Sequence, residues 1–345
     1  MSDKEQTYAN AGVDIDAGGR LAARIKEIVR STRRPEVLAG VGPFASLFRL
    51  GDYREPVLVA SADGVGTKLN IAVAMQRYDT VGVDLVNHSV NDILTTGADP
   101  LFFLDYIASA DLGEDEKVAV VKGLATACAK VRCALVGGET ADMPDVYLPG
   151  AFDLAGFIVG VVEKDSILDG STIRAGDALL GLASSGLHTN GYSLARKVFD
   201  VGKGESEAER ERLYRTYPEL GLTLGEALLT PHRCYHAEVR PLLPYLKGMA
   251  HITGGGLVDN VPRVLPEGLA ARFDKGTWRV PPIFTLIQRE GGVEDDEMHR
   301  VFNMGLGMVL VCGEESVEAV QSLLPEARVV GQVVPQAGDR RVIIK

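Results

Sequence analysis

The stretch VLVASADGVGTK at residues 57–68 joins an apolar run of strand length to a turn that contains two glycines. An apolar run bounded by turn residues is typical of a buried strand. The turn, DGVGTK (63–68), places a carboxylate, a hydroxyl and an ammonium group at the end of that strand. Glycines let backbone N–H groups approach a phosphate, a lysine supplies positive charge and an aspartate can hold a bridging Mg²⁺. The segment predicts a phosphate site, with an ordinary Asp-Gly turn as the open alternative.

On either side of this stretch, strand-length apolar runs alternate with helical periods, which predicts a mixed α/β fold. The expected helices cover 20–31, 83–96 and 114–131, and further apolar runs lie at 101–108, 134–137, 154–162, 178–184 and 307–312. The polar, turn-rich segment 163–177 separates two such alternations. With 345 residues, the chain is long enough for two domains, and we expect α/β domains at 1–168 and 169–345.

The bulk composition argues against several classes of protein. A net charge of −11 is unlike the basic surface that binds nucleic acid. No apolar run approaches the roughly 20 residues that span a bilayer, and the N-terminal residues lack the pattern of a signal peptide. The four cysteines lack the spacing of metal ligands. We therefore expect a cytoplasmic protein with buried thiols and neither a nucleic-acid nor a membrane partner.

The helix expected over 83–96 has an unusual polar face. Its apolar side is formed by valines, Ile93 and Leu94, and the opposite side contains no lysine, arginine or glutamate. Exposed helix surfaces usually contain such charged residues. We expect this face to turn toward a polar ligand rather than toward solvent; it consists of Asp84, Asn87, His88, Asn91 and Thr95, with Asp92 on its flank.

Three carboxylates are candidates for a cation site. Asp63 ends the first strand, Asp92 lies on the helix, and Glu139 precedes Thr140 in the turn GGETA (137–141). Mg²⁺ prefers a few carboxylates together with water and substrate phosphates. Taken singly, each acid also fits a helix cap, a turn or the surface. Asp105, within LFFLDYIA, lies on an apolar strand face, where an ion-paired structural acid and a site residue are equally open alternatives.

Two further segments suit an anion or a close backbone approach. SSGLHTNGYS (184–193) runs from a strand into a helix, so its backbone amides can hold an anion, and His188 can assist as a donor or proton carrier. A turn with a helix cap is the alternative. HITGGG (251–256) implies a tight turn or a close ligand. The chain has no nucleophile elbow, Walker loop or Rossmann glycine fingerprint.

In this order along the chain, the motifs resemble the aminoimidazole ribonucleotide synthetase family, also called phosphoribosylformylglycinamidine cyclo-ligases. The resemblance covers essentially the whole chain and rests on DGVGTK (63–68), VND (90–92), PLFFLDY (100–106), GGETA (137–141), SSG-x-H-x-NGYS (184–193), HITGGG (251–256) and NVPRVLP (260–266). It implies an ATP- and Mg²⁺-dependent closure of formylglycinamidine ribonucleotide to aminoimidazole ribonucleotide, ADP and phosphate, a step of purine biosynthesis. It also implies a homodimer in which N-terminal strands of both subunits close a β-barrel.

The resemblance assigns roles to individual residues. Asp63 and Asp92 would hold Mg²⁺ and the ATP phosphates, with Glu139 assisting. Lys26, next to AGVDIDAG (11–18), a segment expected to be mobile or ordered by a ligand, would close over the nucleotide. His88 receives no role. The phosphate path and cofactor contacts would come from Gly64, Gly66, Thr67, Lys68 and Thr140, and the ribonucleotide contacts from Ser185, Gly186, His188, Asn190, Gly191 and His251.

Several alternative functions remain open, both among enzymes of the same superfamily as this family and outside it. Selenophosphate synthetase needs a reactive cysteine before its glycine-rich segment, yet the first cysteine here is Cys128. Formylglycinamidine ribonucleotide synthetase needs a far longer chain or separate subunits. Thiamine-monophosphate kinase and a hydrogenase maturation factor are enzymatic alternatives, and a nucleotide sensor without turnover is an alternative from another class.

Overall fold

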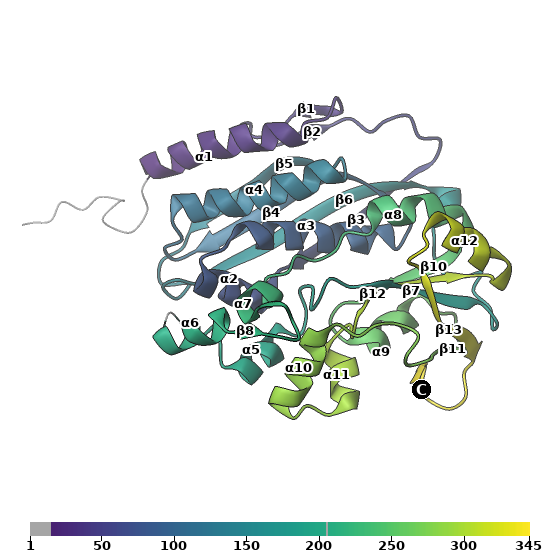
Figure 1. Cartoon of the computed structure of the whole chain (residues 1–345). Helices are drawn as coiled ribbons and strands as arrows, with labels where there is room; N and C mark the ends of the chain where they lie inside the picture. The colour runs from purple at the N-terminus through teal and green to yellow at the C-terminus, as the bar shows by residue number, and fades with distance from the viewer. Residues whose placement is uncertain (1–14, 205) are drawn as a thin grey trace, which may run out of the picture.

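The computed structural model describes residues 15–204 and 206–345 and contains two main β-sheets, one in each half of the chain (Figure 1). The N-terminal sheet has the strand order β3-β6-β4-β5. Only β4 and β5 run parallel; the other neighbours are antiparallel. The strands are β3 (Pro56–Gly64), β4 (Asp99–Ser109), β5 (Ala134–Asp142) and β6 (Phe152–Glu163).

Helices cover one face of this sheet. On the other face, Phe48 packs on Phe102 of β4 and Ser46 donates to the Val136 carbonyl (2.6 Å), while among the described residues the part formed by β3 and β6 stays exposed. Helix α3 (Asp79–Leu94) packs on β3, β6 and β4, and α4 (Glu114–Lys130) packs beside it on β5. Helix α1 (Ile15–Val29) lies on α4 and is followed by the 3₁₀ turn η2 (Arg30–Thr32). On the open face, Leu58 is 62% exposed and Phe157 is 47% exposed. Strand alternation therefore places an apolar row on an uncovered sheet face.

The C-terminal sheet has six strands in the order β10-β12-β7-β13-β11-β14. All neighbours are antiparallel except β11 and β14. The strands are β7 (Ala178–Ala183), β10 (Leu246–His251), β11 (Leu269–Phe273), β12 (Leu306–Cys312), β13 (Arg328–Pro335) and β14 (Val342–Ile344). The larger helices of this half are α5 (Tyr192–Phe199), α6 (Glu207–Tyr214), α10 (Pro282–Gly291), α11 (Asp295–Val301) and α12 (Val317–Leu323).

Short elements connect these layers. Near the N-terminal sheet lie β1 (Val37–Ala39), β2 (Leu47–Phe48), η3 (Gly66–Lys68) and α2 (Leu69–Met75). The second half adds η4 (Lys164–Ser166), β8 (Thr216–Tyr217), β9 (Leu222–Thr223), α7 (Leu224–Leu228), α8 (His236–Val239), η5 (Arg240–Tyr245), α9 (Gly256–Asn260), η6 (Val261–Arg263) and η7 (Glu314–Ser316).

The two halves share a core. The largest cluster of buried apolar side chains joins Leu85 and Val86 of α3 to Leu187, Tyr192 and Phe302 of the second half. Figure 1 shows α3 running between the N-terminal sheet and the C-terminal half. This contact places the polar face of α3 against the second half of the chain. Groups of that half therefore determine the binding partners of this face. The boundary at residue 168 stays a prediction.

The mixed α/β class is confirmed, and so are the expected elements, with small shifts in their bounds. The helix expected over 20–31 begins at Ile15, and the strand expected over 134–137 continues to Asp142. Three of the four free cysteines are buried and Cys234 is half-buried. Among the described helices, none combines the length and apolar character needed to cross a bilayer. Residues 11–14 of the AGVDIDAG segment lie outside the described residues.

Candidate functional site

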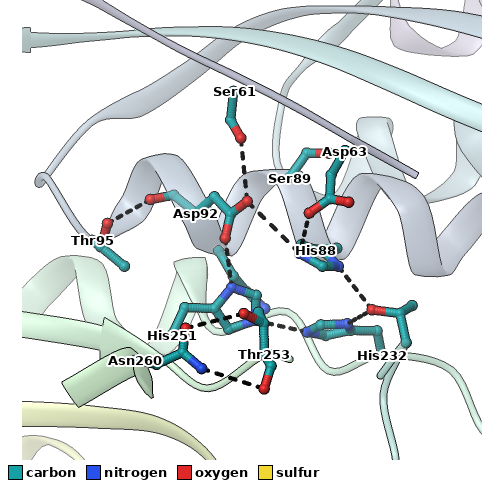
Figure 2. Close-up of polar contacts among 12 residues, drawn as sticks. Ser61, Asp63, His88, Ser89, Asp92, Thr95, His232, His251, Thr253 and Asn260 are labelled. Atoms are coloured by element: carbon teal, nitrogen blue, oxygen red, sulfur yellow. Dashed lines mark hydrogen bonds and ion pairs between the residues drawn. The ribbon is translucent and has the colours of Figure 1, made fainter. Parts of the chain in front are cut away.

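A cavity of about 470 Å³ lies where the N-terminal sheet and α3 meet the second half of the chain. Asp63 enters it from the end of β3, and His88 and Asp92 enter it from α3 (Figure 2). From the other side, the polar lining comes from His251 at the end of β10, Asp169, Thr253, Asn260 and Arg263. The structure thus brings together Asp63, Asp92 and His251, which the sequence names from three separate motifs.

Asp63 is held by its neighbours in an ionised state. One carboxylate oxygen accepts from the backbone N–H of Gly64 (2.7 Å), and the other lies 2.8 Å from His88 Nε2. Burial by itself would raise the pKa of Asp63, but the hydrogen bond and charge of His88 bring that pKa below its usual value.

Asp92 is also held in an ionised state, in this case mainly by His251 from the second half of the chain. Its Oδ1 lies 2.8 Å from His251 Nδ1, and its Oδ2 accepts from Ser61 Oγ (3.2 Å) and lies 3.7 Å from His88 Nε2. Burial raises the pKa of Asp92, and the hydrogen bond from His251 more than offsets this, so the net direction is downward. Two ionised carboxylates therefore face one cavity.

A chain of hydrogen-bonding groups connects these two carboxylates through both halves of the molecule (Figure 2). His88 Nδ1 lies 2.8 Å from Thr189 Oγ1, which lies 3.4 Å from His232 Nδ1. His232 Nε2 lies 3.0 Å from His251 Nε2. Burial lowers the pKa of His232 and of His251. Burial also acts to lower the pKa of His88, but Asp63 and Asp92 beside it produce a net rise.

Sequence reasoning missed three residues of this cavity region. His88 received no role, although it lies one helical turn before Asp92 on the same polar face, and this spacing was a usable signal. Arg263 lies within NVPRVLP, a segment quoted only for the resemblance. His232 lies in a loop with no motif spacing, so only the folded chain places it beside His251.

The structure does not support the expected phosphate contact of Lys68. Its side chain is fully buried, and its ammonium donates to Asp84 Oδ1 (2.9 Å), the His188 carbonyl (3.0 Å) and the Thr230 carbonyl (2.8 Å). These three acceptors use all three donors of the group. The prediction is wrong because Lys68, at the end of η3, instead ties this turn to α3 and to two loops of the second half.

The rest of the 63–68 turn stays open to a ligand. Gly66 and Thr67 are exposed, and Gly66 adopts a φ of +68°, a conformation that favours glycine. Thr67 Oγ1 lies 3.3 Å from Ser193 Oγ, so this turn adjoins the start of α5. Gly64 pairs with Ala155 at the end of the β3 ladder.

Half of the polar face of α3 binds the protein rather than a ligand, which corrects part of the expectation for that helix. Asp84 accepts from the His232 backbone N–H (2.7 Å), and Asn87 donates to the His232 carbonyl (2.6 Å). Asn91 donates to the Arg233 carbonyl (2.8 Å) and accepts from the Tyr235 N–H (2.9 Å). Buried backbone groups of an irregular segment need such partners. Of this face, His88, Asp92 and Thr95 reach the cavity.

Glu139 lies on β5, at the opposite edge of the N-terminal sheet from Asp63 on β3. Asp63 pairs with Gly156 on β6, Gly156 with Asp105 on β4, and Asp105 with Gly138 on β5. At about 4.8 Å per strand spacing, the backbones of Asp63 and Gly138 are about 14 Å apart. One cation cannot touch Asp63, Asp92 and Glu139 within one subunit, so the three-carboxylate set is wrong for the single chain.

A second cavity, of about 610 Å³, lies between α1 and the strands β4 and β5. Its lining includes Leu21, Ile25, Asp105 and Thr140. Among the described residues, none forms an ion pair with Asp105, and burial raises the pKa of Asp105 to about 7. This excludes the ion-paired alternative within the described chain. Lys26 is exposed on α1 and lines a smaller cavity of about 260 Å³, away from Asp63.

The SSGLHTNGYS segment is also divided between exposed and buried roles. Ser185 is exposed, with Oγ donating to the Pro231 carbonyl (2.6 Å). His188 is fully buried, stacks on His232 with ring centroids 3.9 Å apart, and has a pKa well below its usual value because of burial. The prediction that His188 contacts a substrate directly is therefore wrong for this structure. The ring packs behind the cavity, and its Nε2 accepts from the Ser185 backbone N–H (3.1 Å).

Three other residues of these motifs have clear positions. Gly186 accepts through its carbonyl from Asn303 Nδ2 (2.8 Å). Gly191 has a φ of +77°, and a Cβ there would lie 2.2 Å from the Phe302 ring. Asn190 lies beside the triple-glycine turn, because a Cβ on Gly254 would lie 3.3 Å from Asn190 Oδ1. The 184–193 and 251–256 segments thus meet.

The sequence matches the models of one known protein family over most of its length. The family models described as AIR synthase related protein match residues 45–162 with the N-terminal domain and residues 174–344 with the C-terminal domain. A phosphoribosylformylglycinamidine cyclo-ligase of Thermoanaerobacter sp. (strain X514) is 49% identical over 336 residues, which cover 96% of this chain and 98% of the relative. One of Nitrosospira multiformis is 53% identical over 324 residues, covering 92% and 89%.

Among solved structures, a crystal structure of hydrogenase maturation protein HypE in complex with ATP has the same fold, with a TM-score of 0.67 at 16% identity, covering 95% of this chain and 90% of that one. At that identity the likeness shows the fold alone. The match to both family models and the near-complete coverage of the cyclo-ligases confirm the resemblance seen in the motifs. The chain is an enzyme of the ligase class and belongs to the AIR synthase family.

Proposed function

We propose that this enzyme uses ATP to close formylglycinamidine ribonucleotide into aminoimidazole ribonucleotide, with release of ADP and phosphate. The relatives that carry the cyclo-ligase name support this substrate pair. The structural observation that carries the proposal is the pair of ionised carboxylates, Asp63 and Asp92, facing a cavity that Arg263 also lines. Such a cavity suits a phosphorylated substrate and a cation-bound triphosphate.

The chemical difficulty of the step defines what the protein must do. A formamide oxygen is a poor leaving group, so its phosphorylation by ATP turns it into one that departs as phosphate. An amidine nitrogen of the same molecule then attacks the activated carbon and closes the ring. The protein contributes mainly orientation and charge neutralisation, as in other phosphoryl transfers.

The residues present fit a divalent cation near the phosphates. Asp63 and Asp92 are ionised, face one cavity and can accept a cation between them. The cation, Mg²⁺ in the simplest case, would neutralise phosphoryl charge there. The exposed Gly66–Thr67 turn adjoins Ser193 at the start of α5 and supplies backbone amides on the same side. We assign binding of the ribonucleotide to Ser185, Gly186, Asn190 and Gly191. His251 is proposed to contact the substrate in the cavity between the two halves.

The open face of the N-terminal sheet supports the proposed homodimer. Leu58 on β3 and Phe157 on β6 form part of an exposed apolar row, which is what a second copy would cover. Glu139 pairs with Tyr106 on this open face. A role for Glu139 at the nucleotide therefore requires the dimer, whereas Thr140 lines the cavity beneath α1 and is proposed to contact the nucleotide there.

The test of the proposed function is turnover. Purified enzyme with ATP, Mg²⁺ and formylglycinamidine ribonucleotide should form ADP and aminoimidazole ribonucleotide in equal amounts, measured by a coupled ADP assay and by diazo coupling of the aminoimidazole. Binding of ATP without turnover would favour the alternative of a non-catalytic nucleotide sensor. Phosphorylation of thiamine monophosphate in place of ring closure would favour the alternative of a thiamine-monophosphate kinase.

A further inference from the structure

We propose that a cavity at the end of α4 binds a phosphorylated small molecule with an aromatic or apolar body, which is the chemistry of a nucleoside monophosphate. This cavity has a volume of about 980 Å³ and is lined by the end of α4, by residues 165–168 and by the α8–η5 segment (236–244). We call it the α4–η5 cavity. Its lining includes none of the residues assigned to ring closure, so the inference does not rest on the proposed function.

Two cations of the α4–η5 cavity have no acidic partner. Lys130 ends α4, Arg132 follows it in the turn to β5, and both residues are exposed. The ion pairs formed among the described residues around the cavity include neither of them. Cations that line one cavity without acids beside them create a positive potential there. In a chain with a net charge of −11, this cavity is therefore a local site for an anion.

The two acids of the lining do not cancel this charge, because other cations already pair with them. Asp99 lies 3.0 Å from His236 Nε2 and accepts from Arg240 Nε (2.6 Å) and Nη2 (2.8 Å). Burial raises the pKa of Asp99, but the hydrogen bonds from His236 and Arg240 bring it to about 2. Asp165 pairs with Arg54, outside the cavity. Nη1 of Arg240 has no partner among the described residues and adds a further donor to the lining.

The backbone of Arg132 is fixed by the end of the helix. Arg132 has a φ of +55°, and its N–H donates to the Ala129 carbonyl (3.2 Å), while the Cys133 N–H donates to the Cys128 carbonyl (2.9 Å). This pair of bonds is a Schellman motif, in which glycine is the usual left-handed residue. The Arg132 carbonyl also accepts from Arg34 Nη1 (2.7 Å). The guanidinium of Arg132 thus extends from a rigid turn, which favours bidentate binding of a phosphate.

Apolar side chains form the rest of the lining. Ile167 is 38% exposed, Leu168 and Leu243 are half-buried, and Pro241 and Pro244 lie beside them. A free phosphate needs no apolar surface, whereas an aromatic ring or a sugar buries one. Small-molecule sites are usually apolar clefts of about 300–1,000 Å³ with a few polar groups. The combination of cations and apolar groups therefore selects an anion with an organic body.

The α4–η5 cavity shares one wall with the cavity of about 470 Å³ that contains Asp63 and Asp92. Leu168 lines both cavities, and its N–H donates to the carbonyl of Thr96, which lines the smaller one. Gly97 lines the larger cavity, where a Cβ would lie 3.2 Å from the Ser166 carbonyl oxygen. A ligand of the α4–η5 cavity therefore contacts this wall without entering the smaller cavity.

The test uses adenosine monophosphate as the probe on the full-length enzyme. A saturating non-hydrolysable ATP analogue with Mg²⁺ is present, so that the nucleotide position of the reaction is filled. Calorimetry should detect one further adenosine monophosphate per chain. Inorganic phosphate and adenosine, which each lack one part of the probe, should bind at least about tenfold more weakly. Lys130→Gln and Arg132→Gln should each weaken the probe at least about tenfold, because each removes a charge-assisted bond to the phosphate.

A matched control is Lys122→Gln. Lys122 is another exposed lysine of α4, outside the cavity, so this variant should leave binding of adenosine monophosphate unchanged. Photolabelling with 8-azidoadenosine monophosphate, followed by mass spectrometry of the peptides, gives the position of the ring. The label should lie within residues 165–168 or 236–244.

Three results would overturn the inference: no binding of the probe beside the ATP analogue, labelling confined to residues outside these two segments, or equal weakening by Lys122→Gln. Inorganic phosphate that binds as tightly as adenosine monophosphate would overturn the assignment of an organic body. None of these results bears on the proposed function, because formation of aminoimidazole ribonucleotide is measured without the probe.

Discussion

At the scale of single residues, the charge of Asp63 and Asp92 depends on histidines that pack beside them. Each carboxylate is partly buried, and burial favours the protonated form. His88 and His251 reverse this effect through hydrogen bonds of 2.8 Å. The acids therefore keep a negative charge where the proposed reaction needs it.

Replacing one of these acids tests its role directly. Asp63→Asn removes one charge and keeps the shape of the side chain, so turnover should fall by at least about a hundredfold with little change in folding. The measurement is kcat/KM with ATP, alongside a thermal melt. Asp296→Asn, at an exposed position on α11, is the control and should be silent. Normal turnover by the Asp63→Asn variant would remove this residue from the cation site.

Asp105 provides a pH-dependent prediction. Burial raises its pKa to about 7 from an ordinary 3.8, so between about pH 4 and pH 7 the folded protein keeps a proton that the unfolded chain has released. Stability from the protonated group is therefore lost as pH rises through that window. Asp105→Asn is neutral at every pH. Relative to the wild type, its free energy of unfolding should rise by roughly 2–3 kcal/mol between pH 5 and pH 8.

Urea unfolding at the two pH values measures this difference. Asp296→Asn again serves as the control, because an exposed acid contributes little to the pH dependence of folding. A constant difference between Asp105→Asn and the wild type at both pH values would contradict the raised pKa.

At the scale of elements, the Lys68–Asp84 pair joins η3 to α3, and Lys68 also bonds two loops of the second half. The ammonium lies 2.8 Å from Asp84 Oδ2, and both side chains are fully buried. Removal of one member of a buried pair leaves the other charge without compensation. Lys68→Met should therefore lower the free energy of unfolding by about 3–5 kcal/mol, with the KM for ATP little changed in the fraction that folds.

Urea unfolding and ATP kinetics together check this structural role. Lys197→Met removes an exposed lysine of α5 and should leave stability unchanged. Wild-type stability combined with a large rise in KM for ATP would instead restore the phosphate contact that the sequence suggested for Lys68.

At the scale of the whole molecule, the sheet of the N-terminal half has one face packed by helices and another that, among the described residues, stays exposed at β3 and β6. Leu58→Asp places a charge within the exposed apolar row and should convert the proposed dimer to monomer at micromolar concentration, because a buried unpaired charge opposes association. Light scattering after size-exclusion chromatography measures the mass. Leu323→Asp alters another exposed leucine, on α12, and should leave the mass unchanged. A wild type that is already monomeric would contradict the dimer.

The sequence by itself determined the element order, the α/β class and the two carboxylates that meet in the cavity. Those signals are local: apolar period, turn residues and motif order are all readable along the chain. Only the tertiary structure decided which polar groups face the cavity and which form hydrogen bonds and ion pairs inside the protein. Lys68 and the polar face of α3 have the same composition as a ligand site, yet the second half of the chain supplies their partners. Distances across the sheet likewise separate Glu139 from Asp63, because strand order is a long-range property that no local motif contains.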